Sequence, residues 1–168
     1  VIILPDIQQE FTIDRSTASI PFALTMVGFA IGNGVMGRIV DRYGITKTII
    51  LAATINTAGY ISAMQVSNIY LLTILQFFIG FGTAASFGPL IADTSHWFLK
   101  RRGIAVALIA SGNYFSGAVW PPIFNSTLQS DGWRDVYGIL AMATIFIMIP
   151  LSFLLTKKIT EETSRISD

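Results

Sequence analysis

The sequence contains no cysteine and a single histidine among its 168 residues. Disulfide bonds and thiolate metal sites are therefore excluded within this chain. Charge is also scarce, because 12% of the residues are Asp, Glu, Lys or Arg, against roughly 25% in a typical soluble domain. A water-soluble protein covers its surface with charge, whereas a lipid-facing surface excludes it. The shortage of charge predicts a membrane protein.

Long stretches without any charged residue cover 16–37, 48–92, 103–130 and 136–156. A bilayer crossing needs about 20 mostly apolar residues in a helix, and an open sheet in lipid would leave backbone groups unsatisfied. The second stretch is long enough for two crossings, which the polar turn Gln65–Asn68 separates. The sequence predicts an all-α polytopic transmembrane helical bundle with helices near 17–40, 48–66, 69–95, 104–127 and 135–156.

The connections between these helices alternate in charge. Nine of the eleven basic residues fall on one side, namely Arg38, Arg42, Lys47, Lys100, Arg101, Arg102, Lys157, Lys158 and Arg165. The other side carries Arg15 and Arg134 among several acidic residues. The positive-inside rule assigns the basic side to the cytoplasm. We expect an integral protein of the plasma (inner) membrane whose polar linker, 157–168, is cytoplasmic.

The N-terminal run Val1–Leu4 is apolar but ends at Pro5, so it is too short for the apolar core of a signal peptide. We interpret it as the end of a longer, truncated helix. One further helix would give six crossings with both ends in the cytoplasm.

Small residues are concentrated on several predicted helices. Examples are Gly28, Gly32, Gly80, Gly82, Gly112 and Gly117. Small side chains let membrane helices approach closely. This pattern predicts tight packing and leaves open that the same faces slide during a conformational cycle.

Prolines and aromatic residues mark other positions on these helices. Pro89 and the pair Pro121-Pro122 lie inside predicted helices, where a proline removes a backbone hydrogen bond and tends to kink the helix. The pair is either a cavity wall or flex point, or a fixed kink. Aromatic residues at predicted helix ends are expected as interfacial anchors: Tyr43, Trp97, Trp133 and Tyr137.

Polar side chains occur at mid-membrane depth on two predicted helices. Asn113 and Trp120 share one helical face with Tyr114 beside it, and Gln76 and Thr83 share another. Polar groups at this depth face the bundle interior or a solvated pathway. We expect these five residues to line a substrate pathway, and the competing interpretation is hydrogen bonding between helices.

Asp93 is the one acidic residue within a predicted apolar helix, close to His96, Lys100 and Arg101. A carboxylate at this depth costs several kcal/mol unless it is paired. It therefore either carries a proton or forms a salt bridge with an arginine of the cytoplasmic loop. A proton relay through His96 is a further alternative.

The segment from Gly37 to Lys47 resembles the cytoplasmic signature between helices two and three of the major facilitator superfamily. The residues that match this signature are Gly37, Asp41, Arg42, Gly44 and Lys47, whereas Ile45 and Thr46 replace residues that are usually basic. The resemblance implies that Asp41 lies at a helix start and latches the two halves of a transporter together. Asp93 is the matching carboxylate at the end of helix four.

A second segment, Trp97 to Ala107 followed by Gly112, resembles the loop into helix five of monocarboxylate transporters and oxalate/formate-type antiporters. Its pattern is an aromatic residue followed in order by Phe, any residue, Lys, Arg and Arg. Ala107 stands where glycine is common in that loop. The resemblance covers the whole chain as the N-terminal six-helix half of a major facilitator fold, with the first helix truncated and the C-terminal half missing. Gln76 occupies the position where many relatives carry arginine.

This resemblance implies a secondary active transporter that moves small organic anions, such as mono- or dicarboxylates, by alternating access as a symporter or antiporter. Its conformational switch would comprise Gly37, Asp41, Arg42, Gly44, Lys47, Asp93, Lys100, Arg101 and Arg102. The expected partners are a small-molecule solute, the lipid bilayer and the missing C-terminal half, without nucleic acid, cofactor or metal. The alternatives are a non-transporting sensor or assembly subunit and a membrane-embedded enzyme. An enzyme needs a convergent set of catalytic groups, and none is expected here.

Overall fold

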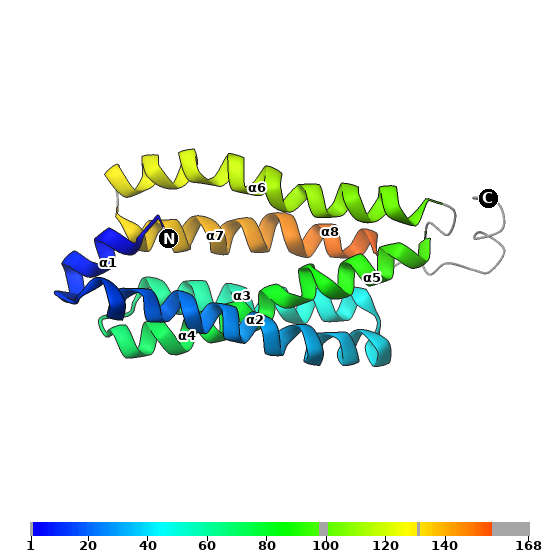
Figure 1. Ribbon diagram of the computed structural model, residues 1–168, viewed down its shortest axis with the longest axis horizontal. Helices are drawn as coiled ribbons and strands as arrows, with labels where there is room; N and C mark the ends of the chain where they lie inside the picture. The colour runs from blue at the N-terminus through cyan, green and yellow to red at the C-terminus, as the bar shows by residue number, and fades with distance from the viewer. Residues whose placement is uncertain (1, 98–100, 131, 156–168) are drawn as a thin grey trace.

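The computed structural model describes residues 2–97, 101–130 and 132–155, and every regular element in these ranges is a helix. The all-α fold class is confirmed. Long helices form parallel rods (Figure 1). In chain order the elements are α1 (Leu4–Phe11), α2 (Arg15–Tyr43), α3 (Ile45–Met64), α4 (Ile69–Thr83), the 3-10 turn η1 (Ala84–Ser86), α5 (Gly88–Trp97), α6 (Arg102–Ser130), α7 (Trp133–Ala143), the π-helical turn η2 (Thr144–Met148) and α8 (Ile149–Leu154).

Four segments are long and apolar enough to cross a membrane: Arg15–Tyr43, Ile69–Ser95, Gly103–Ser130 and Trp133–Leu154. The remaining rod, α3, has 20 residues, but Lys47 and several threonines lower its apolar character. Two of its polar residues, Thr48 and Asn56, are buried against neighbouring helices. A fifth crossing through α3 therefore stays a prediction.

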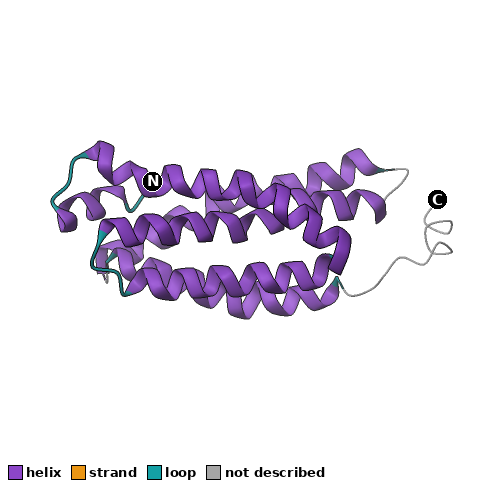
Figure 2. Ribbon diagram, turned by 90° about the horizontal axis from the view of Figure 1, so that it is seen from below, coloured by secondary structure: helices purple, strands orange, loops and turns teal. Residues whose placement is uncertain are grey.

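Connections at the two ends of the bundle alternate along the chain. The α2–α3 connection, the end of α5 and the start of α6 lie at one end, and the α3–α4 and α6–α7 connections lie at the other, next to α1 (Figures 1 and 2). Because two rods, α3 and the α4–α5 rod, separate the α2–α3 connection from the end of α5, these two basic parts of the chain lie at the same end. This arrangement is the one that the charge pattern requires.

Helices α2 and α4 approach each other so closely that their backbones touch. A β-carbon added at Gly28 would overlap the carbonyl oxygen of Phe77, and one added at Gly80 would overlap the carbonyl oxygen of Thr25. Gly112 and Gly117 on α6, in contrast, have nothing within 4 Å of the corresponding position. Only some of the small residues therefore serve helix packing within this chain.

Two of the rods change helix type just before a proline. The turn η1 precedes Pro89, and η2 precedes Pro150. A proline lacks the N–H that would bond to the residue four positions earlier, and its ring crowds that carbonyl. Helix α6 continues without interruption through Pro121 and Pro122, so the pair does not break the helix.

The main apolar cluster lies toward the end of the bundle that carries α1, and it includes Ile7, Leu72, Trp133 and Tyr137. Trp133 is 4% exposed and Tyr137 is 3% exposed. The prediction that these two aromatic residues are interfacial anchors is wrong, because α1 and the α3–α4 connection cover them. Tyr43, at the opposite end, is exposed.

Candidate functional site

The α2–α3 connection is a tight turn built on Gly44. Its φ of +85° is one that residues with a side chain rarely adopt. The Gly44 N–H donates to the Val40 carbonyl at 2.8 Å, and the Gly44 carbonyl accepts from the Thr48 hydroxyl at 2.9 Å. One residue therefore ends α2 and begins α3, which explains the second glycine of the motif.

Asp41 lies in the last turn of α2, and Gly44 is the N-cap of α3. The expectation that Asp41 stands at a helix start is therefore wrong. A carboxylate near the C-terminal end of a helix faces the negative end of the helix dipole and is destabilised there. Its placement costs stability, which favours a functional reason for an acidic residue at this position.

A cavity of about 260 Å³ brings Asp41 together with Asp93 of α5. Its remaining lining is Gly37, Val40, Pro89 and Ala92. Two carboxylates from helices far apart in the sequence thus share one cavity at the basic end of the bundle. Because a carboxylate favours a nearby cation, the exposed Asp41 gives the cavity a group that could receive a basic side chain.

The predicted switch residues Arg42, Lys47 and Arg101 do not line this cavity. The Arg42 guanidinium lies 5.4 Å from the centre of the Tyr43 ring, and Lys47 and Arg101 are exposed. Lys100 and the side chain of Arg102 lie outside the described residues. The exposed cations are available to partners on other helices or to lipid phosphates.

Gln76 on α4 forms hydrogen bonds with two neighbouring helices. Its amide oxygen accepts from the Thr25 hydroxyl at 3.1 Å, and its amide nitrogen donates to the Tyr137 hydroxyl. Gln76 therefore joins α2, α4 and α7. It takes part in the hydrogen bonding between helices that the sequence left as the alternative to a pathway role.

Thr83 lies two turns further along α4, where it is exposed and accepts from the Asn56 amide at 3.4 Å. The Asn56 side chain is 4% exposed, and its amide oxygen has no hydrogen-bond partner among the described residues. An unsatisfied buried acceptor costs about 1–3 kcal/mol. Asn56 therefore hydrogen-bonds to Thr83 from a buried position on α3, while Thr83 itself stays exposed.

Helix α6 presents the second group of predicted pathway residues. Asn113, Trp120 and Pro121 line a groove of about 370 Å³ that Ile2 and Leu140 close from the other side. The Trp120 ring stacks on Phe124 at 5.2 Å between centroids. Tyr114 is 80% exposed and points away from this groove, because adjacent residues on a helix are about 100° apart. Asn113 and Trp120 thus share a face that excludes Tyr114.

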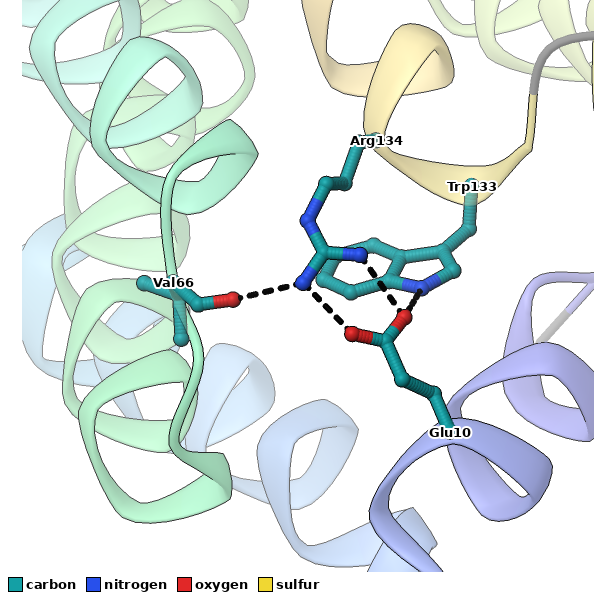
Figure 3. A network of polar contacts seen from close by, with 4 residues as sticks. All are labelled: Glu10, Val66, Trp133 and Arg134. Atoms are coloured by element: carbon teal, nitrogen blue, oxygen red, sulfur yellow. Dashed lines mark hydrogen bonds and ion pairs between the residues drawn. The ribbon is translucent and has the colours of Figure 1, made fainter.

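At the end of the bundle that carries α1, a polar cluster joins three segments (Figure 3). The Arg134 guanidinium donates to both carboxylate oxygens of Glu10, at 2.7 and 2.5 Å, and to the Val66 carbonyl at 2.9 Å. The Trp133 indole N–H also donates to Glu10, at 2.5 Å. We call these four residues the outer clamp. It ties α1 and the α3–α4 connection to the start of α7.

Arg134 holds the pKa of the Glu10 carboxyl below its ordinary value of 4.5, chiefly through hydrogen bonding. In the sequence, both residues are charges among others outside the apolar stretches, and nothing there predicts their pairing. Two opposite charges separated by 124 positions give no sequence signal, since only the fold brings them together. Among the described residues, no group of three His, Cys, Asp or Glu side chains is placed to hold a metal ion.

The family model described as Major Facilitator Superfamily matches residues 1–167. The chain belongs to this superfamily. Its relatives are transporters rather than enzymes. The fujikurins efflux protein of Gibberella fujikuroi is 30% identical over 75% of the chain and 28% of that protein. Monocarboxylate transporter 11 of Homo sapiens is 27% identical over 85% of the chain and 31% of that protein. The riboflavin transporter MCH5 of Saccharomyces cerevisiae is 30% identical over 74% of the chain and 25% of that protein.

The chain spans about a third of the length of the curated relatives that it matches. Membership of the major facilitator superfamily makes it an integral membrane protein with a half-bundle of the transporter fold. The Asp41–Asp93 cavity and the polar residues of α4 and α6 are its candidate sites within that half.

Proposed function

We propose that the chain forms one wall of a secondary active transporter that moves small organic anions by alternating access. The cavity that joins Asp41 to Asp93 carries this proposal. The Asp41 carboxylate at the basic end of one half-bundle can bind a cation from the other half in one state and release it in another. This exchange would couple the rocking of the two halves to the solute.

The organic-anion preference rests on two supports. The loop from Trp97 to Ala107 resembles that of monocarboxylate transporters, and a protein named as one of them is among the relatives. The charge-free stretches hold no Lys or Arg, so a cation that pairs with a carboxylate solute would come from the missing half. Gln76, Thr83 and Asn113 would supply neutral hydrogen-bonding groups and Trp120 would flank them. Tyr114 points away from the groove that Asn113 lines and would lie outside the pathway.

The orientation in the membrane follows from charge. The end of the bundle that carries Arg38, Arg42 and Lys47 would face the cytoplasm. The linker after α8 would then be cytoplasmic, and the plasma (inner) membrane is the expected location. The outer clamp would face the opposite side.

The switch is tested with the full-length carrier in proteoliposomes, by counterflow of a radiolabelled monocarboxylate. We expect Asp41→Asn to lower the transport rate about tenfold or more while expression and membrane insertion stay unchanged, because the neutral amide cannot hold a cation. Asp41→Glu keeps the charge and serves as the matched control. Full activity of Asp41→Asn would mean that the motif only sets the topology of the loop. Binding of the solute without transport by the wild type would favour a sensor over a transporter.

A further inference from the structure

A groove of about 540 Å³ runs along the outside of α7, between α3 and the end of α6. Its volume falls within the range of about 300–1,000 Å³ that is common for small-ligand sites. The walls are apolar, with Ile61 and Met64 from α3 and Met142 and Ile145 from the α7–η2 rod. Gly138 forms part of the floor, where an added β-carbon would lie 3.1 Å from the Met64 methyl carbon.

One charged group lines this groove, the carboxylate of Asp135 in the first turn of α7. Asp135 is exposed and makes no ion pair with another described residue. Its neighbour Arg134 does not neutralise it, because the outer clamp holds the Arg134 guanidinium on Glu10 and the Val66 carbonyl (Figure 3). A carboxylate that no described residue neutralises thus lies at the end of the apolar groove.

The dimensions of the groove match one leaflet of a membrane. Asp135, Gly138, Met142 and Ile145 form a single stripe on the rod, and ten residues at 1.5 Å each extend about 15 Å. That length is half of a hydrocarbon core about 30 Å thick. Asp135 lies at the end of the span where headgroups meet water, and Ile145 lies near the midplane.

We propose that this groove binds one phospholipid with a primary-ammonium headgroup from the leaflet on the clamp side. An acyl chain lies along Gly138, Met142 and Ile145, and the ammonium pairs with Asp135. A primary ammonium donates hydrogen bonds to a carboxylate, whereas a quaternary choline headgroup has no N–H to donate. Met142 is 54% exposed, so the groove is open toward the surroundings of the bundle.

The proposal is tested on the purified full-length protein by native mass spectrometry with equal amounts of dioleoyl phosphatidylethanolamine, phosphatidylcholine and phosphatidylglycerol. We expect phosphatidylethanolamine to be retained about three- to tenfold better than the other two. Asp135→Asn should abolish this preference, Asp135→Glu should keep it, and Asp6→Asn on α1 is the control that leaves it unchanged. Equal retention of the three lipids, or an unaltered preference in Asp135→Asn, overturns the proposal.

A second set of measurements tests whether protein rather than lipid fills the groove, and whether the result depends on misfolding of the Asp135 variants. A photoreactive amino acid in place of Met142 should crosslink to phospholipid in membranes. Crosslinking to another segment of the same protein would show that a helix fills the groove and would overturn the proposal. Ile145→Trp should lower the retention of all three lipids, since it fills the apolar channel, while the melting temperature stays unchanged. Unchanged lipid retention in Ile145→Trp counts against the groove as the site.

Discussion

The Arg134 side chain makes several interactions at once at the start of α7. It stacks over the Trp133 ring at 4.5 Å while it pairs with Glu10 and Val66. A bidentate pair with further hydrogen bonds is stronger than an isolated surface pair, although about a third of each side chain is still exposed. Solvent therefore screens part of the attraction. The clamp fixes α1 to α7 with a modest energy that depends on charge.

The first prediction concerns the pH dependence of this pair. Because the pKa of Glu10 is lowered in the folded protein, its contribution to stability is present above the ordinary pKa of 4.5 and is lost as pH falls through the lowered value. We expect Glu10→Gln to lower the melting temperature of the detergent-solubilised full-length protein by about 1–3 °C near pH 7. The difference from wild type should shrink as pH falls below 4.5 and through the lowered pKa of Glu10.

Asp6→Asn on the same helix is the matched control. It should show no such pH-dependent difference, since Asp6 lies outside the outer clamp. A wild type and a Glu10→Gln variant that melt together at neutral pH would mean that the ion pair stabilises nothing measurable.

At the scale of helices, prolines do not all have the same effect. The turns η1 and η2 deviate from the α-helix before Pro89 and Pro150, whereas α6 accommodates Pro121 and Pro122 without a change of helix type. Helix α6 is also the most exposed of the spans. Helix α2 also stays α-helical through Pro21, which is buried, so a helix need not be exposed to accommodate a proline.

Contact between α2 and α4 leads to a second prediction. Gly28→Ala places a methyl group on the Phe77 carbonyl, so α2 and α4 must separate. Overpacking of this kind costs about 1–3 kcal/mol. Gly34→Ala on the same helix has open space around it and should be neutral or stabilising, because alanine favours the helix by about 1 kcal/mol. Thermal unfolding of both variants in detergent measures the difference, and equal stability would contradict the close approach.

Helix α6 carries a third prediction. If Asn113 contacts the solute, Asn113→Ala should weaken the apparent affinity several-fold and leave the folded yield normal. A packing role gives the opposite result, a lower yield with an unchanged KM in the surviving carriers. Tyr114→Phe is the control, because Tyr114 points away from the groove that Asn113 lines. Measuring KM and detergent-solubilised yield on the same full-length variants decides between the two roles.

At the scale of the whole molecule, the alternation of connections predicts a topology. This chain contains no cysteine. Any cysteines elsewhere in the full-length protein are first replaced, and single cysteines are then introduced. Labelling from outside should modify positions 68 and 131, whereas positions 47 and 100 should react only after permeabilisation. The physical reason is the retention of basic loops in the cytoplasm. Labelling of positions 68 and 100 from the same side of the membrane would exclude the model with five crossings.

The charge-free stretches and the loop motifs determined the helical membrane class and the membership of the superfamily. These properties are local, because about 20 apolar residues commit a segment to a helix in lipid whatever its neighbours are. The motif gave the position of Gly44, whereas its positive φ and the tight turn came from the structure.

Pairings between distant residues were decided only by the tertiary structure. The outer clamp, the burial of Trp133 and Tyr137, and the use of Gln76 to join three helices depend on which faces meet. Gly28 and Gly117 look alike in sequence, yet one touches a backbone and the other touches nothing. The physical reason is that a helix repeats every 3.6 residues regardless of context, whereas its rotation against a neighbour follows from the packing of the whole bundle.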